Sequence, residues 1–209
     1  MNTDLTKAKE MVLHTAKKCY RDGILTVSNG NVSVYDIQSG IMTITPSSIP
    51  YDIMELDDIV CVTLDGVKMN GERKPSSEWR MHAVVYKEMP GIKAVIHTHS
   101  PYASSFSVNK MGIPPIMIEM IPLLGGDVKV ADFAIPGTED VGYEAVKVLA
   151  GRNACLLANH GVLAVGGDLD KASERAACVE ESAKIYSIAL SNGQIHPIPD
   201  ETVEKMRGR

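Results

Sequence analysis

The sequence lacks any apolar run that is long enough to cross a membrane. Hydrophobic residues make up 44% of its 209 residues, but no uninterrupted stretch approaches the roughly 18 residues that a transmembrane helix requires. The segment Met1 to Lys7 also lacks the basic start and the apolar stretch of a secretory signal peptide. We therefore expect a cytoplasmic protein without a membrane partner.

Two further absences narrow the chemistry. The four cysteines, Cys19, Cys61, Cys155 and Cys178, form no Cys-x-x-Cys pair, which argues against a thiolate zinc site or a thioredoxin-like motif. In a cytosolic chain we expect them to be buried, reduced thiols. The net charge is −5 and the basic residues are scattered. Nothing in the sequence therefore predicts the clustered positive surface that nucleic-acid binding requires.

What the sequence does contain is a succession of helical and strand-like segments. Apolar residues recur at helical spacing, or helix-start residues precede them, in five segments: 4–21, 76–89, 102–108, 138–150 and 168–190. In the second of these we expect Ser76 or Ser77 to be the N-cap. Short alternating or apolar runs predict strands over 41–45, 59–64, 93–99, 113–118, 127–130, 154–158 and 162–165.

The order of these segments predicts the fold class. No internal repeat, low-complexity segment or linker interrupts residues 1–209. Strands in the first half follow one another without intervening helices, which favours antiparallel pairing. We therefore predict a single three-layer αβα domain with a mixed, largely antiparallel central sheet. We expect the tail, residues 191–209, to contact a neighbouring subunit.

Three histidines stand at or just after the ends of predicted strands. His97 and His99 are two residues apart, so in a strand they share one face, roughly 6.5 Å apart along the chain. His160 follows another apolar run, and Glu78 lies upstream in a Pro-Ser-Ser-Glu-Trp segment. Three protein ligands with one open position are typical of a catalytic zinc site. The sequence therefore predicts a metal-centred active site, although a single histidine is more often an ordinary hydrogen-bonded residue.

Two turns carry groups that suit an anion, each with a plainer interpretation as well, and a third offers spare hydroxyl groups. The turn over residues 26–34 offers backbone N–H groups and an Asn31 amide, but its spacing alone favours a simple hairpin turn. Residues 46–50 form a rigid turn with spare hydroxyl groups. The helix start at Ser76 attracts phosphate, or is simply a capped helix with an acidic first turn. His82 lies four residues after Glu78 on the same helix face, and we interpret it as a packed residue rather than a ligand.

Five motifs, taken together, resemble the class II aldolase/adducin head family in order and spacing. They are Gly30–Val34, Ile44–Tyr51, Pro75–Trp79, His97–His99 and Asn159–Gly161. The resemblance spans about residues 5–190, and it is greatest to the L-fuculose-1-phosphate aldolase branch.

The resemblance implies a zinc enzyme that reversibly splits a ketose 1-phosphate into dihydroxyacetone phosphate and an aldehyde. The implied substrate is L-fuculose 1-phosphate or a related 5-deoxy or 6-deoxy ketose 1-phosphate, with L-lactaldehyde as one such aldehyde. A cyclic homotetramer with active sites between adjacent subunits is also implied. His97, His99 and His160 are the implied zinc ligands, and Glu78 is the implied acid/base that reaches the metal when substrate is absent. The implied phosphate-binding residues are Gly30, Asn31, Ser47, Ser48, Ser76 and Ser77.

The sequence departs from the family pattern at three places. Ser48 stands where the family usually has glycine. Residues 116–120 and the tail 201–209 contain no tyrosine, whereas the fuculose-phosphate enzymes use tyrosines at the aldehyde end. Glu119 or water is then left to act there, so the sequence does not specify the aldehyde.

Two other functions stay open at this point. L-Ribulose-5-phosphate 4-epimerase uses the same metal to break and remake a carbon–carbon bond. A non-catalytic adducin-like interaction module belongs to the same family but is expected to have lost its metal ligands. The presence of all three histidines and Glu78 argues against this last alternative.

Overall fold

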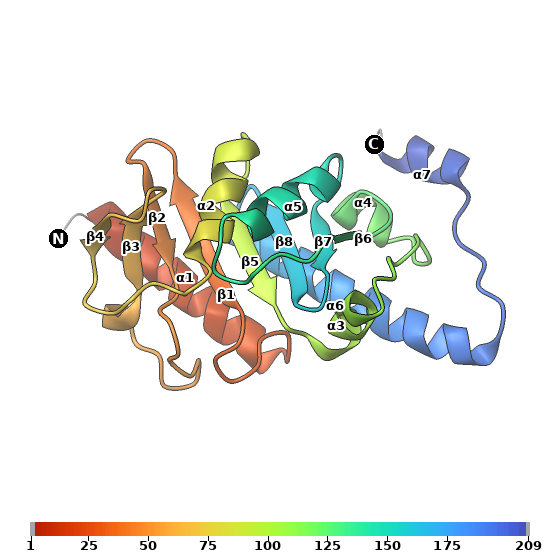
Figure 1. Cartoon of the computed structure of the whole chain (residues 1–209), viewed down its shortest axis with the longest axis horizontal. Coiled ribbons are helices and arrows are strands. Elements are labelled where there is room, and N and C mark those ends of the chain that lie inside the picture. Colours follow the sequence, from red (N-terminus) through yellow and green to blue (C-terminus); the bar gives the residue numbers. More distant parts are fainter. Residues whose placement is uncertain (1–2, 208–209) are drawn as a thin grey trace.

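The computed structural model describes residues 3–207 and places an eight-stranded sheet between two layers of helices (Figure 1). The strand order is β4-β3-β2-β1-β5-β8-β7-β6. All neighbouring strands are antiparallel except β6 and β7, which are parallel. The predicted mixed, largely antiparallel sheet is therefore confirmed. The strands are β1 (Asn31–Asp36), β2 (Ile41–Ile44), β3 (Val60–Thr63), β4 (Lys68–Asn70), β5 (Ala94–Thr98), β6 (Lys129–Ala131), β7 (Ala154–Leu157) and β8 (Gly161–Gly166).

Helices cover both faces of the sheet. Helices α2 and α5 lie on one face, and α1, α3, α4 and α6 lie on the other (Figure 1). Within residues 3–207, no helix combines the length and the apolar character that a membrane crossing would need. The helices are α1 (Thr3–Arg21), the 3-10 helix η1 (Leu56–Asp58), α2 (Trp79–Glu88), α3 (Pro101–Val108), α4 (Met120–Leu124), α5 (Asp140–Leu149), α6 (Leu169–Asn192) and α7 (Asp200–Arg207).

Strand β5 lies between β1 and β8 near the middle of the sheet. Because both faces of the sheet are covered, its side chains are apolar on either side. Ala94 and Ile96 pack in the core beside α1 and α6, whereas Val95 packs in the core beside α2 and α5. His97 follows Val95 by two residues, so its ring lies on the α2 side of the sheet. The alternation of this strand thus directs an imidazole towards the start of α2.

Two local predictions are wrong. Residues 113–118 do not form a strand: Ile113 makes one isolated bridge to Val128, because two prolines follow and cannot donate to a ladder. Helix α2 begins at Trp79, with Glu78 as its N-cap residue, so neither Ser76 nor Ser77 caps it. The reason is that the amide of Ser76 donates to the carbonyl of Thr45 at 3.0 Å, which holds this segment against the loop after β2.

The C-terminal segment packs against its own chain. Val203 of α7 is buried, and Nε of Arg207 donates to the carbonyl of Gly125 at 2.7 Å. The amide of Ile198 donates to the carbonyl of Pro115 at 2.8 Å. These contacts place α7 beside α4 (Figure 1). Docking of the tail on a neighbouring subunit stays a prediction.

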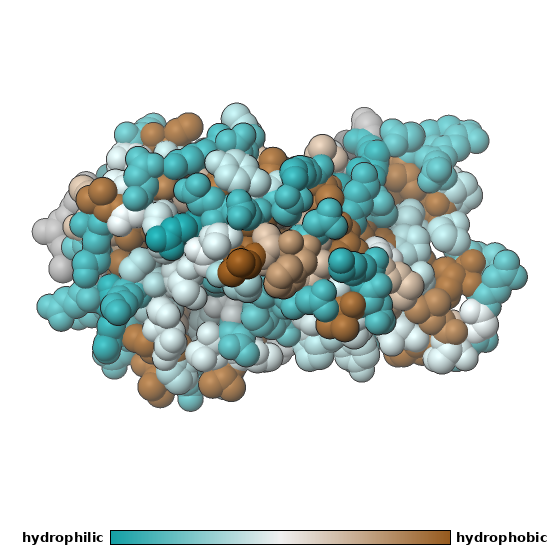
Figure 2. Space-filling view, in the orientation of Figure 1, coloured by the Kyte–Doolittle hydropathy of each residue, from teal (hydrophilic) through white to brown (hydrophobic). Residues whose placement is uncertain are grey.

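Exposed apolar residues are scattered on the face drawn in Figure 2, among a majority of hydrophilic ones. Exposed examples in the chain include Val27, Ile37 and Ile135, which belong to three different connecting segments. Single exposed apolar residues are normal in folded proteins. This view therefore marks no broad apolar docking face.

Candidate active site

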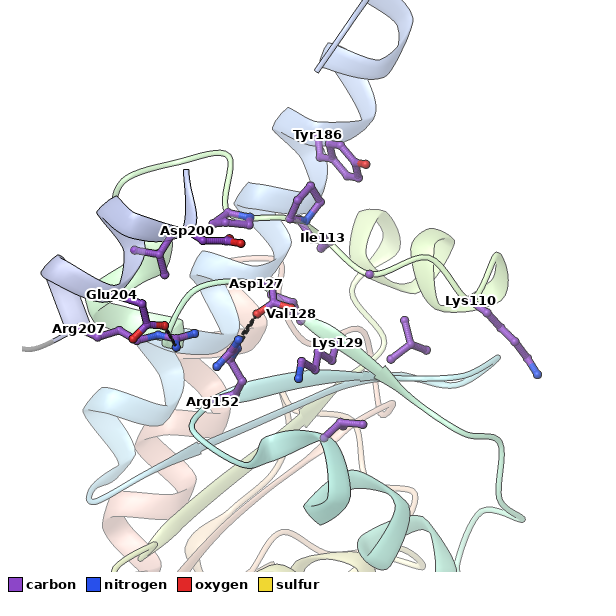
Figure 3. Close-up of a pocket in the computed structure, with 16 residues that line it drawn as sticks. Lys110, Ile113, Asp127, Val128, Lys129, Arg152, Tyr186, Asp200, Glu204 and Arg207 are labelled. Carbon is purple, nitrogen blue, oxygen red and sulfur yellow. Dashed lines mark hydrogen bonds and ion pairs between the residues drawn. The ribbon is translucent and has the colours of Figure 1, made fainter. Parts of the chain in front are cut away.

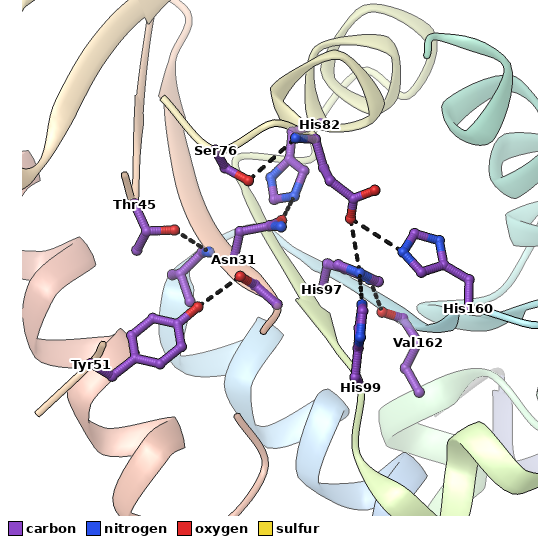
Figure 4. Close-up of polar contacts among 12 residues, drawn as sticks. Asn31, Thr45, Tyr51, Ser76, His82, His97, His99, His160 and Val162 are labelled. Atoms are coloured by element: carbon purple, nitrogen blue, oxygen red, sulfur yellow. Dashed lines mark hydrogen bonds and ion pairs between the residues drawn. The ribbon is translucent and has the colours of Figure 1, made fainter. Parts of the chain in front are cut away.

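The structure brings together all four residues that the sequence predicts around a metal. One ligand atom from each of Glu78, His97, His99 and His160 lies within 4.8 Å of the others. Oε2 of Glu78 is 2.9 Å from Nε2 of His97 and 3.4 Å from Nε2 of His160. The Nε2 atoms of His97 and His99 are 2.8 Å apart (Figure 4). We refer to these four residues as the histidine–glutamate cluster.

Each member of the cluster comes from the end of a regular element. His97 is in β5 and His99 follows the end of that strand, whereas Glu78 precedes α2. His160 lies in the tight turn between β7 and β8, where its amide donates to the carbonyl of Leu157 at 3.0 Å. Asn159 has a φ of 56°, a left-handed conformation that asparagine tolerates better than most residues. Local turn chemistry and strand pairing therefore fix the four ligand positions.

A backbone hydrogen bond sets the tautomer of His97. Its Nδ1 lies 2.8 Å from the carbonyl oxygen of Val162, which can only accept, so Nδ1 carries the proton. The lone pair of Nε2 then points at Glu78 and His99, as in histidines that bind a metal. Nε2 of His97 and the Glu78 carboxylate thus present lone pairs to each other at 2.9 Å, and a cation between them removes that repulsion.

The charges in the cluster also suit a cation. Burial alone raises the pKa of the Glu78 carboxyl, but the imidazoles of His160 and His97, when protonated, outweigh burial and hold that pKa well below its usual range. Burial and the neighbouring imidazoles lower the pKa of His99 to about 4. At neutral pH the site therefore presents an ionised carboxylate and a neutral His99 ring, which are the forms that bind metals.

The donor set fits a divalent transition metal. Ligand atoms at about 2.0–2.1 Å from a tetrahedral zinc ion would lie about 3.3 Å apart; three separations in the cluster are 2.8, 2.9 and 3.4 Å, and all lie within 4.8 Å. Within residues 3–207, Oε1 of Glu78 is buried without a hydrogen-bond partner, as expected for a carboxylate that has a further ligand to meet. All four cysteines are buried free thiols, so the nitrogen and oxygen donors define this site.

The turns predicted to bind an anion adjoin one another. The amide of Ser47 donates to the carbonyl of Lys74 at 3.0 Å, and an isolated bridge joins Pro46 to Pro75. The turn that carries Ser47 and Ser48 therefore lies against the turn that carries Ser76 and Ser77.

The start of β1 is tied to the same two turns. Thr45 accepts the amide proton of Val32 on its Oγ1 at 3.2 Å, and its own amide donates to the carbonyl of Val32 at 3.0 Å. The hydroxyl of Tyr51 donates to the carbonyl of Gly30 at 2.7 Å (Figure 4). Asn31 stands directly opposite His97 in the pairing of β1 with β5. The three turns thus line one side of the histidine–glutamate cluster. We call them the anion turns; they carry Gly30 and Asn31, Ser47 and Ser48, and Ser76 and Ser77.

Gly30 and Ser48 differ in how well they suit their backbone. Gly30 has a φ of 89°, and a Cβ there would lie 2.5 Å from the carbonyl oxygen of His97, so only glycine fits. Ser48 has a φ of 63°, a conformation that costs a residue with a Cβ roughly 1–2 kcal/mol. Asn31 and Ser76 are buried, whereas Ser48 and Ser77 are exposed.

The structure confirms His82 as a packed residue and reveals two partners that the sequence analysis missed. His82 is fully buried, and its ring nitrogens contact Asn31 and Ser33. Ser33 in turn contacts the hydroxyl of Tyr86. Spacing offered a signal, because Ser33 follows Asn31 by two residues in a strand and Tyr86 follows His82 by four in a helix.

A large cleft lies elsewhere, between α7 and the edge strand β6 (Figure 3). Its volume is about 970 Å³, and no member of the histidine–glutamate cluster lines it. Nε of Arg152 donates to Asp127 at 2.6 Å, and Arg207 pairs with Glu204 at 2.6 Å. Because two of its basic groups are already partnered, this cleft is a weaker candidate for an anionic substrate than the anion turns.

Glu119 does not reach the cluster in this chain. It is exposed at the start of α4 and lines a small cleft with Cys178 and Ser182 of α6. The carboxylate therefore lies beside α6 and outside the histidine–glutamate cluster of its own chain.

Comparison with known proteins agrees with this geometry. The family described as "Class II Aldolase and Adducin N-terminal domain" matches residues 10–187. A 5-deoxy-D-ribulose 1-phosphate aldolase of Bacillus thuringiensis serovar kurstaki is 33% identical and covers 97% of this chain and 94% of its own. An L-ribulose-5-phosphate 4-epimerase of Salmonella paratyphi C is 29% identical, with coverages of 96% and 93%. A solved L-fuculose 1-phosphate aldolase superposes with a TM-score of 0.93 at 36% identity, over 100% of this chain and 96% of that one. The chain therefore belongs to the class II aldolase and adducin N-terminal domain family, as an enzyme of the class II aldolase type.

Proposed function

We propose that this protein is a zinc-dependent aldolase that reversibly cleaves a ketose 1-phosphate to dihydroxyacetone phosphate and an aldehyde. The observation that carries the proposal is the juxtaposition of the histidine–glutamate cluster with the anion turns. His97, His99 and His160 would hold the ion, and Glu78 reaches it when no substrate is bound. Gly30, Asn31, Ser47, Ser48, Ser76 and Ser77 would bind the phosphate.

Each half of this arrangement has a chemical task. The bound ion supplies Lewis-acid stabilisation for the negative charge that develops when the C3–C4 bond breaks. In the cleavage direction the C4 hydroxyl gives up its proton as the aldehyde forms, and the Glu78 carboxylate takes up a proton and passes it to C3; in the synthetic direction the carboxylate removes the proton from C3. The phosphate group, held beside the same turn that carries Glu78, fixes the position of C3 relative to the carboxylate. The Val162 carbonyl holds the ring of His97 in one orientation throughout.

We propose a short 5-deoxy or 6-deoxy ketose 1-phosphate as the substrate. The relative named 5-deoxy-D-ribulose 1-phosphate aldolase aligns over nearly the whole chain. Residues 116–120 and 201–209 offer no tyrosine hydroxyl for a polar aldehyde. A small aldehyde such as L-lactaldehyde needs fewer polar contacts than a longer sugar aldehyde.

The proposal includes a cytoplasmic homotetramer with active sites at subunit interfaces. One observation supports the shared active site: Ser48 and Ser77 are exposed in the single chain, so the anion turns have room for a neighbour to complete the pocket. Light scattering of the purified protein tests this part. A monomeric particle with full activity would contradict it.

A direct assay tests the proposed reaction. The zinc-loaded protein is incubated with L-fuculose 1-phosphate and with 5-deoxy-D-ribulose 1-phosphate, and release of dihydroxyacetone phosphate is followed by its enzymatic reduction. We expect release from at least one substrate and its loss after chelation of the metal. Absence of release from every ketose 1-phosphate would refute the aldolase.

The epimerase is the second candidate, because a named 4-epimerase aligns with 96% of this chain. Its substrate, L-ribulose 5-phosphate, carries the phosphate at the other end of the sugar. Conversion of that compound without release of dihydroxyacetone phosphate would favour the epimerase. A protein that holds the metal but converts neither substrate would favour a non-catalytic interaction module.

A further inference from the structure

A chain of four buried polar groups runs from the core to the anion turns. The hydroxyl of Tyr86 is 2.6 Å from Oγ of Ser33, and Oγ of Ser33 is 2.6 Å from Nδ1 of His82. Nε2 of His82 is 2.5 Å from Oδ1 of Asn31 (Figure 4). The exposed fraction is 0% for Ser33 and His82, 3% for Asn31 and 6% for Tyr86. We call these residues the Tyr86–Asn31 chain.

The acceptor at the Asn31 end decides where the protons lie. Oδ1 of an amide can only accept, so Nε2 of His82 must donate to it. A neutral ring then has an unprotonated Nδ1, which accepts the proton of the Ser33 hydroxyl. Oγ of Ser33 has a lone pair left, and the Tyr86 hydroxyl donates to it. Each of the three hydrogen bonds therefore contains one proton, and the donors follow one order: Tyr86 donates to Ser33, Ser33 to His82 and His82 to Asn31.

This order fixes the end of the Asn31 amide that is free. With Oδ1 occupied by His82, the Nδ2 hydrogens face away from the chain. We propose that His82, oriented by Ser33 and Tyr86, is a positioning residue that turns the donor end of the Asn31 amide towards the substrate phosphate. The inference rests on the proposed function, in which Asn31 binds that phosphate.

The direction of the amide matters because its two ends have opposite character. The Nδ2 end donates two hydrogen bonds, whereas the Oδ1 end repels an anion. A rotated amide would place a lone pair against the phosphate. Because the chain is buried, water cannot compete for Oδ1 and release the amide. The fold therefore keeps Nδ2 of Asn31, at the start of β1, directed away from His82 as a hydrogen-bond donor.

The first test measures the tautomer of His82 in the native enzyme. Solid-state nitrogen-15 spectra of histidine-labelled protein distinguish protonated from unprotonated ring nitrogens, and His82→Gln identifies the signal. We expect the Nε2–H tautomer, with Nδ1 unprotonated, both with and without inorganic phosphate. The Nδ1–H tautomer would overturn the proposal, because Nε2 could then no longer donate to Oδ1 of Asn31.

The second test compares variants that do and do not keep a donor at this place. His82→Leu removes the donor, and we expect about a tenfold weaker binding of inorganic phosphate. We expect a matching rise in KM for the ketose 1-phosphate, with metal content and kcat close to the parent. His82→Gln offers an amide N–H to Asn31 and should restore most of the phosphate affinity. Equal phosphate affinity in folded His82→Leu and the parent would overturn the proposal.

A matched pair of tyrosines supplies the control. Tyr86→Phe removes the first hydroxyl of the chain, whereas Tyr35→Phe removes a hydroxyl from the ring that stacks on Tyr86 at 5.1 Å. We expect a smaller loss of phosphate affinity in Tyr86→Phe and none in Tyr35→Phe. Equal losses in both would indicate a packing effect and contradict the positioning role.

The tests separate this inference from the proposed function. The tautomer and the affinity for inorganic phosphate are measured without any turnover. If the protein cleaves no ketose 1-phosphate but shows the expected tautomer and the His82→Leu effect, the aldolase fails and the positioning role stands. If it cleaves the substrate with the Nδ1–H tautomer, the positioning role fails and the aldolase stands.

Discussion

The two halves of the site are built in different ways. The histidine–glutamate cluster places its ligands at the ends of strands β5 and β7 and at the start of α2, with His97 fully buried. The anion turns are loops, with Ser48 and Ser77 exposed to solvent. Strand pairing and the β7–β8 turn fix the three imidazoles, whereas a few inter-loop hydrogen bonds hold the anion turns, one of which also carries Glu78.

This difference indicates that the histidine–glutamate cluster and the anion turns have different tasks. A metal requires ligand positions accurate to a few tenths of an ångström, which the centre of a sheet can supply. A phosphate tolerates more variation because hydroxyl groups can rotate to meet it. Changes in the cluster should therefore abolish the reaction, and changes in the anion turns should weaken binding of the substrate.

The largest expected effect is that of His97→Ala. Removal of a buried metal ligand should abolish zinc binding and lower kcat/KM by about 10³-fold or more, because the ion is asked to supply several kcal/mol. Metal content by mass spectrometry, turnover and circular dichroism check this. His14→Ala, at an exposed position on α1, is the control and should behave as the parent. Retained turnover in His97→Ala would break the distinction between the two halves.

Glu78→Gln should separate metal binding from proton transfer. The amide keeps the shape of the side chain but cannot exchange the proton at C3, so we expect kcat to fall by about 10²–10⁴-fold. The three histidines remain, and the zinc content should stay near that of the parent. An unchanged kcat would exclude Glu78 as the acid/base.

The buried imidazole of His82 should make the free energy of unfolding depend on pH. Burial lowers the pKa of His82 to about 3, whereas the unfolded chain has a value near 6.5. Between these values only the unfolded state binds the proton, so the free energy of unfolding should fall by about 1.4 kcal/mol per pH unit as pH decreases. Urea unfolding of the parent and His82→Gln measures the difference in slope. Parallel slopes would show that His82 is already protonated in the folded state.

Loss of hydroxyls from the anion turns should affect binding and little else. Ser47→Ala and Ser77→Ala should each raise KM by about three- to tenfold, which corresponds to one hydrogen bond. We expect kcat and zinc content to stay near the parent values. Ser105→Ala, a change at an exposed position on α3, is the matched control. A loss of kcat at unchanged KM would mean that these turns act on the chemical step.

The smallest expected effect is a gain in stability. Ser48 has a left-handed backbone that glycine adopts without strain, so Ser48→Gly should raise the free energy of unfolding by about 0.5–1 kcal/mol. Ser47→Gly, next to it but outside the residues with positive φ, should instead lower it. Urea denaturation compares the two. A loss of stability in Ser48→Gly would show that the Ser48 side chain stabilises the turn.

The cluster was more predictable from sequence than the connections around it. His97 and His99 follow from strand period, and the layer arrangement follows from the order of apolar segments. The bridge between Pro46 and Pro75 joins segments that are distant in sequence, and no local pattern encodes it. That contact moved the start of α2 to Trp79. Helix α4 was not predicted either. The apolar segment before it was interpreted as an edge strand, but its prolines lack the N–H donors that strand pairing requires.

The central claim is that one divalent ion is held by three imidazoles from separate parts of the chain, and X-ray absorption at the metal edge tests it most directly. For the purified protein we predict one zinc ion per chain, with nitrogen and oxygen neighbours at about 2.0–2.2 Å and an imidazole signal that decreases in His160→Ala. A chain that binds no divalent ion, or an ion coordinated by sulfur, would contradict the account.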